Sequence, residues 1–132
     1  MCGCKCGCKG QKGDKGETGK QGVPGTPGAT GNGFTVGVYA AFAGGGQFGA
    51  TNLTDNDNLI STVATTGDSV KLLPAVKNTI QTVRNYGANA MNVFPQAAEQ
   101  IDSLGANVAF SLAAGATITF ACFVNGTFVS GT

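Results

Sequence analysis

Four cysteines near the N-terminus are the residues whose type and spacing most directly suggest chemistry. Lys5 and Lys9 stand among them and favour the reactive thiolate form. The cysteines occupy alternating positions: Cys2, Cys4, Cys6 and Cys8. Neighbours in a Cys-X-Cys pattern bridge poorly within one chain, so disulfides between chains fit the geometry better. Sulfur ligands alone would also suit zinc, Cu(I) or an iron–sulfur cluster. Interchain disulfides, a thiolate metal site and free thiols therefore all stay open.

Other reactive side chains are scattered through the remaining sequence. Asp55 and Asp57 form a D-x-D pair whose oxygens could bind calcium. The glycine and glutamate of an EF-hand loop are missing, so a solvated turn is the simpler interpretation. Cys122 falls on the apolar side of an alternating segment, which predicts a buried, inert thiol. If exposed, it would instead be the natural disulfide partner for the cysteines of a neighbouring molecule. Glu99 and Asp102 could form a carboxylate pair, but solvated loop charges are the simpler interpretation.

The composition excludes several functional classes. The 132 residues include no histidine, which removes Ser-His-Asp and Cys-His catalysis and zinc sites with histidine ligands. A net charge of +1 argues against nucleic acid as a partner. No apolar run is long enough for a membrane-spanning helix, and no secretory signal is visible after Met1. We therefore expect no enzyme, no cofactor, no nucleic-acid partner and no membrane span.

Glycine is concentrated in the first quarter of the chain, where it follows a strict spacing. A collagen triple helix requires glycine at every third residue, because only glycine fits where three chains cross one axis. A flexible glycine-rich linker is the alternative, but a linker would not keep the spacing or restrict proline to third positions, as at Pro24 and Pro27. The predicted axis residues are Gly7, Gly10, Gly13, Gly16, Gly19, Gly22, Gly25, Gly28 and Gly31.

Charged residues inside the glycine repeat alternate in sign. Lys12 precedes Asp14, and Lys15 precedes Glu17, an arrangement that allows ion pairs between staggered chains. Such exposed pairs contribute roughly 0.2–1 kcal/mol each, and ordinary solvated charges are the alternative. Eight triplets are too few to hold three chains together against the entropy of association. We therefore expect clamps at both ends of the repeat.

Residues 34–132 have the pattern of an all-β domain. Apolar and polar residues alternate over residues 108–112 and 117–124, and Gly67-Asp68 and Asn125-Gly126 are hairpin signals. About eight short strands with frequent turns predict a β-sandwich or jelly roll. Ala121 and Phe123 fall on the face opposite the expected core. That face would be either a subunit contact or covered within the sandwich.

These patterns together predict three regions. Residues 1–9 form a cysteine-rich anchor that overlaps the start of the stalk, residues 7–31 a collagen-like stalk, and residues 34–132 an all-β trimerisation head. The predicted fold is a collagen triple helix followed by a β-sandwich or jelly-roll head. Because one chain alone cannot form a triple helix, this fold predicts an obligate homotrimer.

Two parts of the chain resemble known protein families. The Gly-X-Y segment resembles the collagen-like regions of bacterial, phage and large-virus proteins, which are often followed by a trimeric β-head of the C1q/TNF-like kind. Residues 83–95 (VRNYGANAMNVFP) and 112–116 (LAAGA) resemble a pattern common in phage and prophage structural proteins. The resemblance implies a trimeric structural role and carries no catalytic motif.

The function expected from the sequence is therefore structural. The chain would be a subunit of a homotrimeric collagen-like fibre or filament: a virion fibre, a capsid decoration, or an extracellular or spore filament. Its partners would be copies of itself, with polymerisation into a fibre as one option, and a capsid or cell-surface anchor. Its place would be the virion or the extracellular surface, reached without a visible secretory signal. The alternative is a trimeric head that binds a receptor or glycan through exposed aromatic residues such as Tyr39 or Tyr86.

Overall fold

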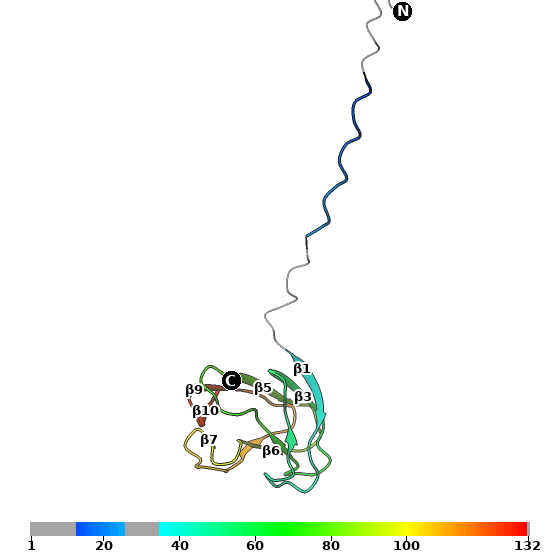
Figure 1. Ribbon diagram of the computed structural model, residues 1–132. Coiled ribbons are helices and arrows are strands. Elements are labelled where there is room, and N and C mark those ends of the chain that lie inside the picture. Colours follow the sequence, from blue (N-terminus) through cyan, green and yellow to red (C-terminus); the bar gives the residue numbers. More distant parts are fainter. Residues whose placement is uncertain (1–12, 26–34, 132) are drawn as a thin grey trace, which may run out of the picture.

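The computed structural model describes residues 13–25 and 35–131 of the chain (Figure 1). Residues 13–25 are an extended segment without regular secondary structure. Residues 35–131 contain ten β-strands in two sheets. Neither described range contains a helix, and none of the described residues therefore belongs to a helix that could cross a membrane.

Most of the strands are short. In chain order they are β1 (Val36–Ala40), β2 (Thr51–Asn52), β3 (Asp57–Thr62), β4 (Ser69–Lys71), β5 (Ile80–Asn85), β6 (Met91–Phe94), β7 (Gln100–Ile101), β8 (Phe110–Leu112), β9 (Thr117–Val124) and β10 (Thr127–Gly131). The large sheet has the order β1-β3-β5-β9-β10-β7, and the small sheet has the order β2-β4-β6-β8.

The chain winds as a solenoid through its first six strands. Each of three successive coils places one strand in the large sheet and the next in the small sheet. Strands β1, β3 and β5 are parallel to one another, and so are β2, β4 and β6. Strands β8 and β9 then run antiparallel to β6 and β5, so the last coil is laid on the stack in the opposite direction.

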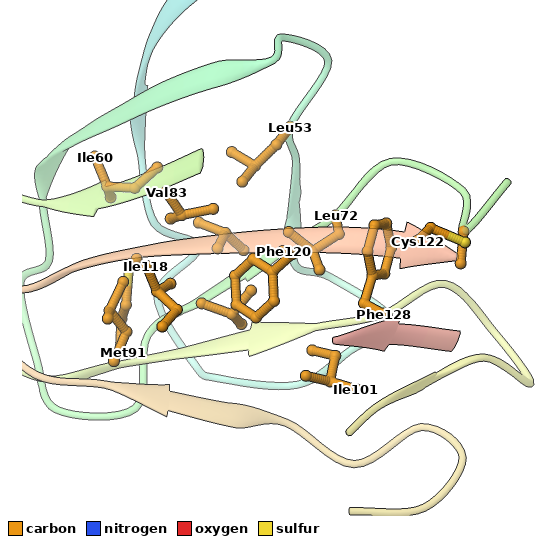
Figure 2. Close-up of a cluster of buried hydrophobic side chains, with 14 of the residues drawn as sticks. Leu53, Ile60, Leu72, Val83, Met91, Ile101, Ile118, Phe120, Cys122 and Phe128 are labelled. Atoms are coloured by element: carbon orange, nitrogen blue, oxygen red, sulfur yellow. The ribbon is translucent and has the colours of Figure 1, made fainter. Parts of the chain in front are cut away.

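The hydrophobic core lies between the two sheets, and its side chains come from alternate positions of the strands. Strand β9 buries Ile118, Phe120 and Cys122 in this way. Figure 2 shows Phe120 surrounded by side chains from several strands. Its ring meets those of Phe110 and Phe128 edge to face, with ring centres 5.5 and 6.3 Å apart. The two sheets are therefore joined by one continuous apolar layer.

The corner after β5 is held against the corner of the coil before it. The side-chain amide of Asn89 donates hydrogen bonds to the carbonyls of Val63 and Ala64, at 2.9 and 3.0 Å. Gly87 lies so close to Val63 that an added Cβ would stand 2.6 Å from its Cβ and its backbone nitrogen. Glycine at position 87 therefore lets the two corners stack.

The prediction of a triple-helical stalk is corrected by this structure. Residues 13–25 form one extended, exposed chain. A Cβ added to any glycine from Gly13 to Gly25 would meet no atom within 4 Å, whereas a triple helix has no room there. A triple helix is built from three chains, and a single chain in an extended conformation has no internal hydrogen bonds to hold it. Residues 13–25 therefore show no collagen triple helix, and the obligate homotrimer loses the basis on which it was predicted.

The predicted β-sandwich or jelly roll was also wrong. Those folds are built from antiparallel strands with hairpin or Greek-key connections. Here the first six strands form three coils, and neighbouring strands of successive coils are parallel. The hairpin expected at Gly67-Asp68 is absent, because β3 and β4 belong to different sheets and these residues form a corner. The hairpin at Asn125-Gly126 is confirmed, since β9 and β10 pair antiparallel on either side of it. Gly126 has the positive φ of 86° that such a turn requires.

Replacing Gly87 by alanine is expected to destabilise the domain. The added Cβ would overlap Val63 at 2.6 Å, and overpacking of this kind costs about 1–3 kcal/mol. Gly46→Ala is the matched control, because a Cβ there meets nothing within 4 Å. Urea denaturation of both variants at one protein concentration measures the difference. Equal free energies of unfolding would contradict the stacked-corner arrangement.

Candidate functional site

Several of the predicted site residues lie outside the described residues. They are the four cysteines, four of the repeat glycines and one lysine: Cys2, Cys4, Cys6, Cys8, Gly7, Gly10, Gly28, Gly31 and Lys12. Their predicted roles in thiol chemistry, axis packing and ion pairing stay predictions. The same holds for the boundaries of the anchor at residues 1–9 and of the stalk at residues 7–31.

The charged residues of the described arm are exposed and have no ionic partner within it. Asp14, Lys15 and Glu17 are all exposed. Among described residues, the one salt bridge joins Arg84 to Asp57 in the head. The interchain ion pairs predicted for the arm would require a neighbouring chain, so they too stay predictions.

The two aspartates of the candidate cation site have separate partners. Asp55 accepts a hydrogen bond from the hydroxyl of Tyr39, and this bond lowers the pKa of its carboxyl group. Asp57 is held by the guanidinium of Arg84 through two hydrogen bonds, Nε to Oδ1 at 2.9 Å and Nη2 to Oδ2 at 3.0 Å. Within residues 13–25 and 35–131, no three potential ligands gather into a metal site. The carboxylates act in the structure as anchors for β1 and β5.

Cys122 is a buried thiol, as its place in the alternating pattern predicted. Only 1% of the residue is exposed, and its thiol donates a hydrogen bond to the carbonyl of Val124 at 3.1 Å. Because the thiol lies in the core between the sheets, it is out of reach of another molecule's cysteine in the folded protein. Cys122 would link neighbouring molecules only if it were exposed, and in the folded protein it is not.

Glu99 and Asp102 are structural, and the prediction that they are solvated loop charges was wrong. Both carboxylate oxygens of Glu99 accept hydrogen bonds from the backbone N–H of Ala75, each at 3.0 Å. Asp102 accepts the N–H of Ser130 at 2.9 Å and its hydroxyl at 2.6 Å. Each carboxylate thus fixes a loop to a distant part of the chain.

The remaining surface of interest is the side of the large sheet that points away from the core, which we call the outer face. Its side chains alternate with the buried ones along each strand, and they are mostly aliphatic, aromatic or threonine. Its members are Val36, Val38, Asp57, Leu59, Ile80, Thr82, Arg84, Thr117, Thr119, Ala121, Phe123 and Val129.

The strand register brings the apolar members of the outer face into rows. Ala121 lies opposite Ile80 of β5 on one side and opposite Val129 of β10 on the other. Phe123 follows two residues along β9 and is 66% exposed. None of the described strands covers this face, so of the two alternatives for Ala121 and Phe123, cover within a sandwich is excluded and a subunit contact stays a prediction.

The sequence pointed to only part of the outer face. It placed Ala121 and Phe123 opposite the core, but it gave no reason to join them to Ile80 or Val129. The signal was present in the alternation of residues 80–84. It becomes usable only once the pairing of β5 with β9 and of β9 with β10 is known.

Aromatic side chains that could serve a ligand-binding head occupy different environments. The hydroxyl of Tyr39 is engaged by Thr54 and Asp55. Tyr86 is largely exposed, and Phe48 is fully exposed in the loop before β2. The part of the chain that the structure describes contains no pocket in which they could converge on a ligand.

Comparison with known proteins leaves the chain without an assigned family. No protein-family model, no curated protein and no solved structure matches it. The geometry of its own residues therefore carries the functional argument.

Asp68 gives the domain an expected dependence on pH. The Thr65 hydroxyl and, after it, the Thr65 N–H donate to its carboxylate at 2.6 and 2.9 Å, and both lower the pKa of Asp68. A carboxyl group whose pKa is lower in the folded state stabilises the fold above its unfolded pKa of about 3.9. That contribution is lost as the pH falls through the folded pKa.

The variant Thr65→Val removes the hydroxyl and should weaken this dependence. Thr66→Val, at the exposed neighbouring position, is the control. Thermal midpoints recorded from about pH 5 down to about pH 2 should fall less for Thr65→Val than for the control. Parallel curves for the two variants would show that Asp68 does not carry the effect.

Proposed function

We propose that the chain is a structural subunit of a homo-oligomeric fibre or surface decoration, in which the β-domain is the head and the glycine-repeat arm links subunits. The observation that carries the proposal is the contrast between the two described parts. The head has a hydrophobic core of its own, whereas a Cβ added to any glycine of the described arm would meet no atom of its own chain within 4 Å.

The arm is the stronger half of this argument. Glycine at every third residue raises the conformational entropy that ordering must overcome. Nothing packs against Gly13, Gly19 or Gly25 within the chain, so no contact there offsets that cost. Contacts with other chains would offset this cost and so explain the regular glycine repeat. We therefore expect at least two copies in the oligomer.

The head supports a mechanical rather than a catalytic role. The carboxylates of Asp57, Asp68, Glu99 and Asp102 all serve as hydrogen-bond acceptors or ion-pair partners within the fold. The chain also lacks the histidine that most general acid–base catalysis uses. A fibre or decoration on a virion or on the outer surface of a cell is the setting that such a subunit would suit.

Binding of a receptor or glycan is less well supported as the primary role. It would use exposed aromatic residues, and Tyr86 and Phe48 are exposed. The two residues lie on different loops, however, and the described head has no pocket. Display of such a head in several copies would still raise its avidity.

The mass of the full-length protein in solution tests the proposal. Sedimentation equilibrium under reducing conditions should give a whole-number multiple of the mass of one chain. Reducing conditions are chosen so that disulfides do not hold the chains together. A single-chain mass across the whole accessible concentration range would overturn the proposal.

The N-terminal cysteines are expected to cross-link these oligomers after oxidation. On denaturing gels without reductant, the full-length protein should give a ladder that collapses to monomer when reductant is added. Replacing Cys2, Cys4, Cys6 and Cys8 by serine should abolish the ladder, whereas Cys122→Ala should leave it unchanged because Cys122 is buried. A ladder lost only in Cys122→Ala would contradict this assignment.

A further inference from the structure

We infer that the outer face of the large sheet is the surface through which copies of this chain associate. The inference rests on the proposed self-association and adds, beside the arm, a contact surface on the head. It commits to one occupant, a further copy of the same chain.

The first observation is that the parallel strands of the large sheet have an apolar face that nothing covers among the described residues. Sheets with parallel strands are usually covered on both faces, and β1, β3 and β5 are parallel. On their core side they are covered by the small sheet. On their outer side Val36, Val38 and Leu59 project without a covering element among the described residues. A covering partner from outside the chain is the arrangement that this strand pattern favours.

The second observation is a compact apolar group on the antiparallel half of the same face. Ile80 and Val129 flank Ala121 in directly opposed positions, and Phe123 extends the group along β9. Ile80 is 48% exposed, Val129 44% and Phe123 66%. Exposed apolar side chains that stand singly require no explanation, but a contiguous group of them marks an interaction site.

The third observation concerns charge and identifies the occupant. The only ionised groups on the outer face are Asp57 and Arg84, which neutralise each other through a two-point contact. All other charged residues of the described head lie in loops or on β4 of the small sheet. The face therefore has no net charge, and a second copy can approach it without like-charge repulsion. A partner with a charged binding surface would find no unpaired charge on this face to bind.

The fourth observation is the row of threonines at the centre of the face. The hydroxyls of Thr82 and Thr119 hydrogen-bond to each other at 3.0 Å across β5 and β9. One of the two O–H donors is thereby satisfied within the chain, so covering the pair leaves a single O–H to be paired. The bond lowers the desolvation cost of burying the centre of the face in a contact between identical surfaces.

The test is a matched pair of substitutions at exposed phenylalanines in the full-length protein. Phe123→Glu, combined with Ile80→Glu, places charge on the outer face. Phe48→Glu adds a single negative charge to a loop in which Gln47 donates hydrogen bonds to Pro95 and Asn107, beside the small sheet. All three side chains are exposed, so circular dichroism should show a folded protein in each case. Sedimentation under reducing conditions gives the dissociation constant.

The expected result is a dissociation constant raised about 30-fold or more by the outer-face double variant. Phe48→Glu should leave it unchanged. If the wild-type protein and the double variant associate equally well, the outer face is not the contact surface, and the proposed self-association is unaffected. A wild-type protein that is monomeric throughout would overturn both proposals. Equal loss in Phe48→Glu would also count against the face, because it would show that added charge alone prevents association.

A measurement on the unmodified protein keeps the inference testable if the double variant does not fold. Hydrogen exchange is compared at protein concentrations above and below the dissociation constant. Association through the outer face should slow exchange in β5 and β9 more than in the loop at residues 43–50. Protection confined to that loop, or to the small sheet, would overturn the inference.

Discussion

The stacking of successive coils is the constraint on which the rest of this structure depends. Each of the first three coils gives one strand to each sheet, so a coil is stable only if its neighbour lies in register on both sides. Backbone hydrogen bonds between parallel strands fix this register, and the corners must be compact enough to allow it. Gly87 packed against Val63, and Asn89 bonded to two carbonyls of that corner, show how closely the corners approach.

The same constraint produces the outer face. Once the coils are in register, the side chains that alternate with the core of β5 and β9 must line up on the opposite side of the sheet. Ile80, Thr82, Thr119 and Ala121 become neighbours because β5 pairs with β9, although residues 86–116 separate the two strands in the sequence. The strand register that packs the core therefore also decides which side chains become neighbours on the outer face. In this protein that surface is neutral and largely apolar.

The sequence predicted local features well and the arrangement of strands poorly. Alternation placed Phe120 and Cys122 in the core correctly, and Asn-Gly identified the final hairpin. Turn residues such as Gly67 mark a change of direction, but they do not say whether the next strand returns to the same sheet or continues into another. Parallel pairing is set by contacts between distant segments, which leave no local signal. The hydrogen bonds of Glu99 and Asp102 were likewise not predictable from the sequence, because their partners Ala75 and Ser130 lie far away along the chain.

Glycine has two different uses in this chain, and the difference bears on function. In the head, most glycines stand where a side chain would not fit or where the backbone takes a positive φ, as at Gly87 and Gly126. In the described arm neither reason applies: Gly13 to Gly25 have open space around them and no positive φ. Glycine is conformationally costly wherever it is not required. If the arm's regular glycines are required at all, the requirement must come from outside the single chain, which is the reason for placing the protein's work between chains rather than within one.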